Sequence, residues 1–400
     1  MRDALHDAPG TTPPWRGLSK TFAFQLPTRV EFGPGAARRI GEEAAQLGCR
    51  PLLVTDPGVL SAGVVDPLLS RLRDAGLETL TFSDVEANPR AATVDATAAA
   101  GRDHGADMVI AVGGGSALDT AKGAAAVITH GGAILDYEGV DRLPGPTIPV
   151  VAVPTTAGTG SEVTAWSIVT DPARHYKMAV GGAYLSPRLA LVDPELTFSL
   201  PPTPTAMTGA DALTHAIEAF TARCSNPISD ALALYAVELI ALHLEAATAD
   251  GGNLEARSAM LLSSLIAGVA FANADTAAVH AMAEALGGVF DVPHGVANAV
   301  CLPHVMRFNL EAVPEKTARI GQAMGLSTLD LPVREAAEAA VEEVRGLLYR
   351  LGTPPLRDLG VTETDIPLLV SIAMMNTGNV DNPVEVDEES FTMLFRRALT

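Results

Sequence analysis

Apolar residues form short, nearly continuous runs in the first half of the chain. These runs occupy residues 51–56 (PLLVTD), 108–115 (MVIAVGGG), 147–154 (TIPVVAVP) and 188–194 (RLALVDP). Such runs are typical of parallel strands that are covered by helices on both faces. Alanine-rich segments such as 36–48 and 90–105 lie between them and end at glycine, as helices often do. The alternation predicts a mostly parallel sheet in an α/β domain.

The pattern changes after a proline- and threonine-rich junction at residues 199–209. Beyond it, segments such as 210–222 and 229–247 repeat apolar residues with the 3.6-residue period of helices. We therefore predict a flexible tail (1–20), an α/β domain (21–198) and an all-α domain (199–400). The most apolar stretch, 258–274, is short for a membrane span and contains serines and an asparagine, which favours a buried core helix.

Composition limits the classes of function. Of the 400 residues, 48% are apolar and 18% are charged, as in a well-buried globular protein. The net charge of −20 argues against nucleic acid and against anionic membrane surfaces as partners. Cys49, Cys224 and Cys301 are few and widely spaced, which is typical of reduced thiols. We expect a cytoplasmic protein that binds neither nucleic acid nor a membrane.

A glycine-rich turn follows the run at 108–115. Gly113, Gly114 and Gly115 would let a phosphate approach the backbone at the start of the next helix, where N–H groups are free. Ser116 and Asp119 match the spacing of a capping box, so a tight turn with a helix cap is the alternative interpretation. The stretch is neither a GxGxxG nor a Walker motif. Alone it is a moderate indication of a nucleotide.

Two further turns follow predicted strands. Asp56 ends the run at 51–56, where a carboxylate can accept hydrogen bonds from a ribose and repel a 2′-phosphate, favouring NAD over NADP. A helix cap is an equally good interpretation of Asp56. The segment 153–164 (VPTTAGTGSEVT) could contact a cofactor or be a simple loop. Together the three turns fit the crevice where open α/β sheets bind ligands.

The second half contains a candidate metal site. Asp211 and His215 are spaced i, i+4, so on a helix both project from one face. His280 lies on a later predicted helix, and His294 stands between a proline and a glycine. One carboxylate and three imidazoles suit Fe(II) or Zn(II), with a position left open for a substrate oxygen. A histidine on an apolar helix is more often a core residue, and the Asp–His pair could be a simple helix contact.

These motifs together resemble the iron-containing (group III) alcohol dehydrogenases. The matching segments are GGGSALDTAK, PTTAGTGSEVT, GADALTHAIEAF and PHGVANAVCLPHVMRFN, in the order and spacing of the family. The resemblance covers nearly the whole chain after the tail and is nearest to the branch of lactaldehyde and propanediol reductases. It implies an N-terminal dinucleotide-binding α/β domain, a C-terminal helical domain as in dehydroquinate synthase, and an active site between them.

The resemblance also implies roles for individual residues. The metal ligands fall on Asp211, His215, His280 and His294. The cofactor contacts fall on Asp56, Asn88, Gly113, Gly114, Gly115, Ser116, Asp119, Thr155, Thr156, Thr159 and Lys177. Trp166 and Phe271 fall where family members shape the substrate pocket.

One position departs from the family pattern. Many members have a histidine four residues after the third metal ligand, whereas this chain has Glu284 there. The family histidine has been assigned proton transfer or nicotinamide contact. Glu284 could replace it as a catalytic proton acceptor, or it could only solvate the cleft.

The resemblance implies an NAD-dependent alcohol dehydrogenase or aldehyde reductase, with a homodimer as the expected assembly. In this mechanism the metal acts as a Lewis acid on a short-chain alcohol or aldehyde, and NAD(H) exchanges the hydride. Two alternatives are a metal-dependent lyase or cyclase of the dehydroquinate synthase type and a non-enzymatic metal- or nucleotide-binding protein. The first would need basic residues in the cleft, of which the helical half has few.

Overall fold

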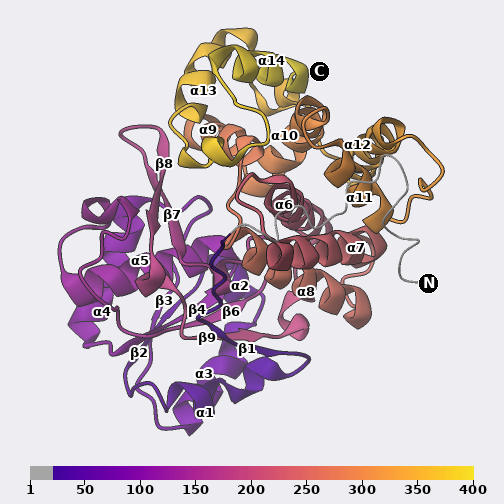
Figure 1. The fold of residues 1–400 in the computed structure, drawn as a ribbon. Coiled ribbons are helices and arrows are strands. Elements are labelled where there is room, and N and C mark those ends of the chain that lie inside the picture. Colours follow the sequence, from indigo (N-terminus) through magenta and orange to yellow (C-terminus); the bar gives the residue numbers. More distant parts are fainter. Residues whose placement is uncertain (1–20) are drawn as a thin grey trace.

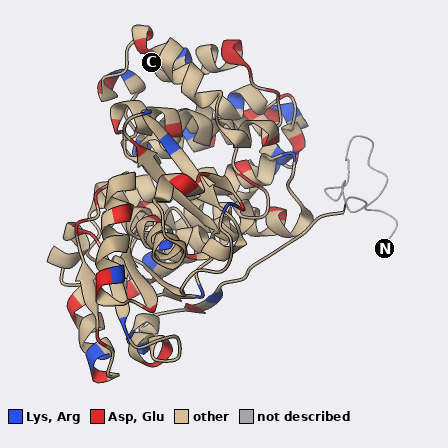
Figure 2. Ribbon diagram, turned by 90° about the vertical axis from the view of Figure 1, so that its left-hand side faces the viewer, with Lys and Arg blue, Asp and Glu red and all other residues tan. Residues whose placement is uncertain are grey.

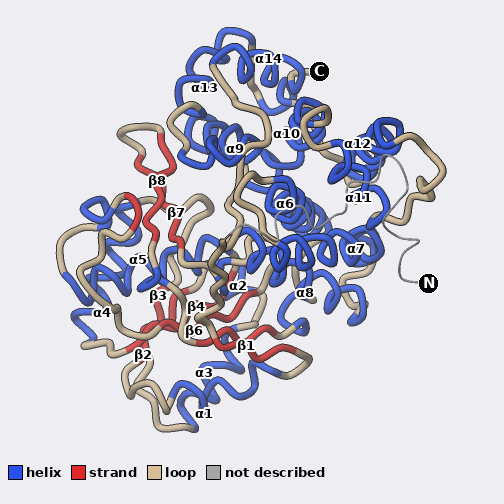
Figure 3. The backbone as a smooth tube through the Cα atoms, in the orientation of Figure 1, coloured by secondary structure: helices blue, strands red, loops and turns tan. Residues whose placement is uncertain are grey.

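The computed structural model describes residues 21–400, so the predicted tail at 1–20 lies outside the described residues. Figure 1 shows the chain folded into an α/β part, drawn in indigo to magenta, and a helical part, drawn from rose through orange to yellow. Figure 3 shows that the strands belong to the first part. The fold class predicted from the sequence is confirmed. The domain boundary near residue 199 stays a prediction.

The main sheet has six parallel strands in the order β1-β9-β6-β4-β2-β3. The four apolar runs form its centre, and two short strands that the sequence did not predict, β1 and β3, form its edges. The strands are β1 (Arg29–Phe32), β2 (Pro51–Val54), β3 (Leu80–Phe82), β4 (Met108–Gly113), β6 (Val150–Pro154) and β9 (Leu189–Val192). The central strands β2, β4, β6 and β9 are buried along their whole length, which explains their unbroken apolar sequences.

Helices connect these strands. They are α1 (Ile40–Ala44), α2 (Pro57–Ser61), α3 (Val65–Asp74), α4 (Ala91–His104) and α5 (Gly115–His130). Helix α4 ends at Gly105 in the left-handed conformation, as predicted. The predicted helix at 36–48 is shorter, because a 3-10 turn occupies residues 36–39 before α1 begins.

A second sheet was not predicted. It is formed by β5 (Gly139–Val140), β7 (Trp166–Asp171) and β8 (Tyr176–Gly181), and β7 and β8 pair as an antiparallel hairpin. Strand β8 packs against helix α9 (Ala278–Phe290) of the helical part. The hairpin therefore lies next to a helix that is far away in the sequence (Figure 1). Lys177 of β8 reaches this helix, since a Cβ atom on Gly287 of α9 would lie 2.9 Å from Lys177 Nζ.

The helical part follows the junction. Besides α9 it contains α6 (Pro202–Thr221), α7 (Pro227–Ala249), α8 (Leu254–Phe271), α10 (His294–Asn309), α11 (Pro314–Ala323), α12 (Val333–Arg350), α13 (Ile366–Ala373) and α14 (Glu388–Ala398). Helices α7 and α8 are long and apolar enough to cross a membrane, but 61% of the most apolar window of α8 is buried inside the protein. Helix α8 packs on α6 and α7, as a core helix does.

The backbones of the two parts come into close contact at a pair of glycines. A Cβ atom built on Gly160, in the loop after β6, would lie 2.5 Å from the Cα atom of Gly268 on α8. Gly160 also has φ +60, in the region that favours glycine. A side chain at either position would push the cofactor-side loop away from α8.

Candidate active site

The three predicted cofactor turns meet because β2, β4 and β6 are neighbours in the sheet. A Cβ atom on Gly114 would lie 3.1 Å from Thr156 Oγ1, and one on Gly115 would lie 2.6 Å from Thr159 Cγ2. Asp56 follows β2, and its Oδ2 would lie 3.2 Å from a Cβ atom on Gly113. The bare backbone of the glycine turn thus faces the threonine loop on one side and Asp56 on the other.

The predicted capping box at the start of α5 is wrong. The helix already begins at Gly115, with Gly114 as its N-cap and no side-chain hydrogen bond to the cap. Ser116 therefore lies inside the first turn, since the extended backbone of Gly114 lets the chain enter the helix earlier than the serine. For Asp56 both interpretations remain, because its Oδ1 accepts a hydrogen bond from Val59 N (2.9 Å) and caps α2.

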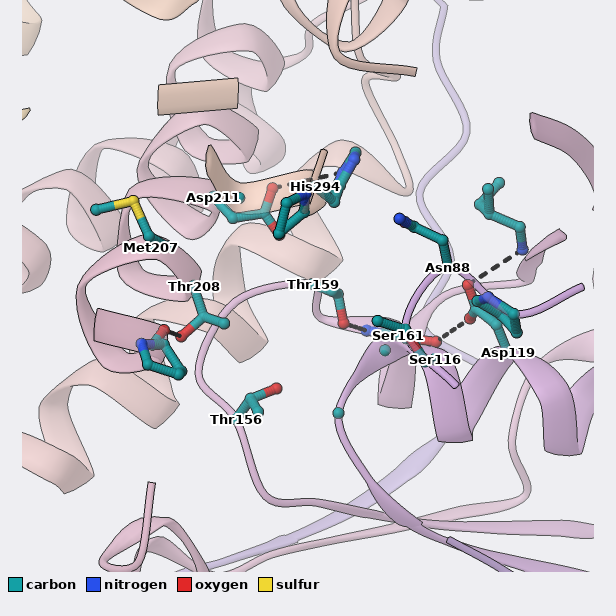
Figure 4. Close-up of a pocket in the computed structure, with 18 of the residues that line it drawn as sticks. Asn88, Ser116, Asp119, Thr156, Thr159, Ser161, Met207, Thr208, Asp211 and His294 are labelled. Carbon is teal, nitrogen blue, oxygen red and sulfur yellow. Dashed lines mark hydrogen bonds and ion pairs between the residues drawn. The ribbon is translucent and has the colours of Figure 1, made fainter. Parts of the chain in front are cut away.

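Asp119 on α5 connects the glycine turn to the threonine loop through hydrogen bonds. Its Oδ1 accepts a hydrogen bond from Ser161 Oγ (2.6 Å), and its Oδ2 accepts one from Ile168 N (3.1 Å). The fully buried Lys122 donates from Nζ to Ser161 Oγ (2.6 Å) and lies 3.1 Å from Asp119 Oδ1. Figure 4 shows Ser116, Asp119, Thr159 and Ser161 gathered on one side of the pocket. Asp119 holds the threonine loop against α5 while it lines the cleft.

Glu162, next to Ser161, gives a pH-dependent prediction. It is 2% exposed, its Oε1 accepts no hydrogen bond from a described residue, and burial raises its pKa to about 7. This value lies above the usual 4.5, so the folded state holds a proton that the unfolded state loses between pH 4.5 and 7. The contribution of Glu162 to stability therefore falls as pH rises through that range. Glu162→Gln is expected to raise the melting temperature at pH 8 more than at pH 5.

Thermal unfolding at the two pH values, followed by circular dichroism, checks this expectation. Glu389→Gln removes an equivalent charge from an exposed position on α14 and serves as the control. A gain for Glu162→Gln that is equal at both pH values would contradict it.

The four predicted metal ligands come together in the helical part. Asp211 and His215 lie on α6, His280 lies on α9 and His294 is the first residue of α10. One ligand atom from each lies within 4.8 Å of the others. Asp211 Oδ1 is 3.5 Å from His294 Nε2 and 3.9 Å from His215 Nδ1. Figure 4 shows Asp211 beside His294, across the pocket from Ser116 and Asp119.

The electrostatics suit a cation. Burial lowers the pKa of His215 to about 4 and that of His294 to about 3, so both imidazoles are neutral and able to ligate at pH 7. Burial alone would raise the pKa of Asp211, but the three imidazoles and Asn298 hold it below its usual range. Asp211 is therefore ionised although it is only 2% exposed.

The orphaned polar atoms of the site also fit a metal. His215 Nδ1 has no hydrogen-bond partner among the described residues. Asn298 Nδ2 lies 2.6 Å from Asp211 Oδ1, 3.3 Å from His280 Nε2 and 3.2 Å from His294 Nε2. The lone pairs thus converge on one small region that only this amide fills. Three imidazole nitrogens and one carboxylate oxygen form a donor set suited to Fe(II) or Zn(II).

Glu218 orients His280, and the sequence prediction missed it. Its Oε2 is 2.5 Å from His280 Nδ1 and accepts from Ala277 N (3.0 Å), and its Oε1 accepts from Val279 N (2.7 Å). Because Nδ1 is held by Glu218, the Nε2 atom of His280 faces Asp211 and Asn298. Such a carboxylate behind a ligand histidine fixes its orientation and raises its basicity. The sequence spacing could have identified Glu218, because Asp211, His215 and Glu218 stand at positions i, i+4 and i+7 and therefore share one face of α6.

One cleft of about 1240 Å³ joins the cofactor turns to the metal ligands. Trp166 and Phe271 both line it, and the Phe271 ring stacks on His215 with centroids 4.4 Å apart. Two predicted cofactor contacts touch each other, since Lys177 Nζ donates to Asn88 Oδ1 (2.6 Å). Thr155 lines the cleft as well.

The charge of this cleft is one-sided. Lys177 is the single Lys or Arg among the described residues that line it. The lining carboxylates are Asp56, Asp84, Glu86, Asp119, Asp211, Asp275 and Glu284. Along the ribbon as a whole, by contrast, both acidic and basic residues occur in both parts of the molecule (Figure 2).

Glu284 faces the cleft from α9, one turn after His280. Its Oε2 accepts a hydrogen bond from Asn376 Nδ2 (2.6 Å). Burial raises the pKa of Glu284, while His280 and Lys177 oppose that rise. Asn376 and Asp275, which also line the cleft, were not identified from the sequence, because nothing in the local pattern distinguishes them from loop residues.

Known proteins resemble the chain over nearly its whole length. Residues 27–194 match the family described as iron-containing alcohol dehydrogenase, and residues 205–399 match the C-terminal part of the Fe-containing alcohol dehydrogenase family. The chain is 43% identical to 1,3-propanediol dehydrogenase of Klebsiella pneumoniae, over 95% of this chain and 99% of that protein. It is 40% identical to choline dehydrogenase of Bacillus subtilis, over 95% of this chain and 96% of that protein.

Solved structures agree. A crystal structure of 1,3-propanediol oxidoreductase superimposes with a TM-score of 0.92 at 43% identity, covering 95% of this chain and 100% of that one. The structure of a sulfoacetaldehyde reductase from Bifidobacterium kashiwanohense, solved in complex with NAD+, superimposes with a TM-score of 0.84 at 33% identity. The match covers 95% of this chain and 99% of that one. The chain therefore belongs to the iron-containing alcohol dehydrogenase family and is a metal-dependent oxidoreductase of alcohols and aldehydes.

Proposed function

We propose that the protein transfers a hydride reversibly between NAD(H) and a short-chain alcohol or aldehyde. The observation behind this proposal is that the four-residue donor set and the glycine turn open into one cleft. The volume of about 1240 Å³ exceeds the roughly 300–1,000 Å³ of usual ligand pockets, which suits a dinucleotide together with a small substrate.

Asp211, His215, His280 and His294 would hold the metal, Fe(II) by family or Zn(II) by ligand chemistry. When bound, the metal supplies Lewis-acid chemistry that favours loss of the hydroxyl proton of an alcohol. The protein's own residues orient the partners: Glu218 fixes His280, and Phe271 packs on His215.

The cofactor would lie along the sheet edge. Gly113, Gly114, Gly115 and Ser116 would present backbone N–H groups to the pyrophosphate, together with the hydroxyls of Thr155, Thr156 and Thr159. Asn88, Asp119 and Lys177 would complete the contacts, Asp119 by positioning Ser161.

Asp56 supports NAD rather than NADP. It lies at the carboxyl end of β2, and the cleft contains no arginine among its described lining residues to pair with a 2′-phosphate. Asp56→Gly is expected to raise the NADP-to-NAD ratio of kcat/KM by about tenfold, since one repelled charge is worth about 1.4 kcal/mol. Glycine is a tolerated N-cap, so α2 should persist. An unchanged ratio in steady-state kinetics would contradict this role, and Asp56→Asn, which keeps the cap, isolates the effect of charge.

Glu284 would act as the proton acceptor for the alcohol, with solvation of the cleft as its alternative role. Its carboxyl has one oxygen held by Asn376 and lies on the cleft wall near His280. If Glu284 accepts the proton, kcat for alcohol oxidation should fall at low pH as Glu284 becomes protonated, and Glu284→Gln should abolish this pH dependence.

A panel of alcohols and aldehydes, assayed with NAD or NADH on protein loaded with Fe(II) or Zn(II), tests the function. Ethanol, 1,3-propanediol and lactaldehyde suit a small pocket shaped by Trp166 and Phe271. Absence of any NADH absorbance change, despite bound metal and cofactor, would reject the proposal in favour of a non-enzymatic binding protein. The rival lyase or cyclase with a phosphorylated substrate finds little support, because Lys177 is the only lysine or arginine among the described cleft residues.

The assembly and location are also proposals. We infer a homodimer in the cytoplasm, with no nucleic acid or membrane partner. Helix α7 leaves Ile228, Tyr235 and Leu242 exposed at heptad spacing, which suits a protein contact. The three cysteines are free thiols, which suits a reducing compartment.

A further inference from the structure

Asp291 ends helix α9 in a backbone conformation that its residue type does not favour. It is the C-cap of the helix, with φ 54 and ψ 28, in the left-handed region. Glycine, and less often asparagine, is the usual residue there, because a Cβ atom crowds the backbone. The carboxylate also lies at the negative end of the helix dipole, which repels it. Two local preferences therefore oppose an aspartate at this position.

The side chain of Asp291 reaches the α/β part of the protein. Its Oδ1 accepts a hydrogen bond from Asn88 Nδ2 (2.7 Å), although the two residues are 203 positions apart in the chain. Asn88 lies in the loop after β3 and has φ 51, so its backbone is left-handed as well. Two residues in a sparsely populated conformation thus contact each other, one from each part. Such conformations persist only where their surroundings fix them, and they concentrate at functional sites.

Asn88 connects Asp291 to Lys177. The other end of its amide, Oδ1, accepts a hydrogen bond from Lys177 Nζ (2.6 Å). An ionised carboxylate can only accept and an ammonium can only donate, so these two neighbours leave the amide a single orientation. Burial lowers the pKa of Lys177, while nearby carboxylates, Asp291 among them, oppose that fall. The three side chains form one row of charge-assisted hydrogen bonds.

Two glycines of α9 allow Lys177 to reach this row. A Cβ atom on Gly287 would lie 2.7 Å from Lys177 Cε, and one on Gly288 would collide with the carbonyl group that precedes β8. Strand β8 can therefore lie directly on the last turn of the helix. Lys177 and Asn88 line the cleft, whereas Asp291 is not among its described lining residues. An effect of Asp291 on the cleft would therefore run through Asn88.

We propose that Asp291 is a positioning residue for the cofactor. By holding the amide of Asn88, it keeps the Lys177 ammonium directed along the cleft wall and leaves the other N–H groups of that ammonium for the cofactor. The inference rests on the proposed function, in which Asn88 and Lys177 contact NAD(H). It explains an aspartate at a helix end where a glycine would be more stable.

The test measures the affinity of the metal-loaded protein for NADH by fluorescence titration. Asp291→Gly removes the carboxylate and suits the left-handed backbone, so the dissociation constant for NADH should rise about three- to tenfold, the usual worth of one hydrogen bond. The melting temperature should equal or exceed that of the wild type, because glycine is favoured at this C-cap and the repelled charge is gone. A purely structural role predicts the reverse, a lower melting temperature and an unchanged dissociation constant.

Two further variants show whether Asp291 acts through Asn88. Asp291→Asn keeps an acceptor oxygen and tolerates the left-handed backbone, so its dissociation constant should stay within about twofold of wild type. In protein that already carries Asn88→Gly, Asp291→Gly should have less than about a twofold further effect, because its partner is missing. Full additivity of the two glycine substitutions, or an equal loss of affinity in Asp291→Asn, would overturn the inference.

Asp141→Gly is the matched control. Asp141 is also an exposed aspartate with a left-handed backbone (φ 54), and it is not among the described residues that line the cleft. Its substitution should leave NADH binding unchanged.

Binding and turnover separate this inference from the proposed function. If the wild type oxidises alcohols with NAD but Asp291→Gly binds NADH with wild-type affinity, the positioning role is wrong and the proposed function stands. If Asp291→Gly weakens NADH binding as expected but the wild type oxidises no alcohol, the proposed function fails and the positioning role stands.

Discussion

His294→Ala is expected to lose bound metal and to lower turnover by about a hundredfold or more. Lewis-acid stabilisation of charge on oxygen is worth several kcal/mol, and each 1.36 kcal/mol is about a tenfold change in rate. His294 opens α10 and is the most exposed of the four residues, with 28% of its side chain accessible. Its truncation should therefore leave the core intact. Metal content by mass spectrometry and NADH formation measure the two effects.

His243→Ala on α7 is the matched control, because His243 lies outside the four-residue cluster. It should keep metal and activity. Full activity of His294→Ala in a preparation verified to be free of metal would rule out a metal-assisted reaction. Circular dichroism should give the same spectrum for both variants.

Glu218→Gln is expected to weaken metal binding by about 10- to 100-fold, the usual effect of removing a partner of a ligand histidine. Glu218 accepts hydrogen bonds from two backbone N–H groups and faces His280 Nδ1. A glutamine has one acceptor oxygen, so its NH2 group must face at least one of these donors. Each buried donor left unpaired costs about 1–3 kcal/mol, so the melting temperature should fall as well.

Metal affinity can be measured by competition with a chelator. Glu255→Gln, at an exposed position in the first turn of α8, should leave metal affinity unchanged and lower stability by no more than about 0.3–1 kcal/mol, the usual worth of a charge at a helix N-terminus. If Glu218→Gln lowers only the melting temperature and leaves metal affinity unchanged, Glu218 is a structural residue and does not position His280 for the metal.

Much of the fold could be predicted from the sequence because the main sheet is buried on both faces. The strands at 51–54 and 108–113 are apolar throughout, so their sequences identify them. The edge strand at 29–32 is partly exposed and mixes arginine with glutamate, so no run marks it. The hairpin of β7 and β8 was missed because its alternating pattern is short and interrupted by a charged turn.

The candidate site was predictable from the sequence where its residues lie on one helix, because their spacing then shows which of them share a face. The i, i+4 pair on α6 pointed to one helix face, but the approach of His280 and His294 came from the family resemblance, since contacts between helices leave no mark on local periodicity. The capping box failed for a related reason. Its spacing was right, but the glycine before Gly115 let the helix start early and freed Asp119 to bond with Ser161 instead.

The contact between Gly160 and Gly268 limits how the two parts of the chain can diverge. Each glycine occupies the space that a side chain on the other would need. Because both positions are already glycine, no change of side chain at one can make room for a side chain at the other, and a substitution at either would have to move the backbone of the loop or of α8. Exchange of cofactor-binding halves between relatives would therefore succeed only when the matching stretch of α8 is exchanged with them.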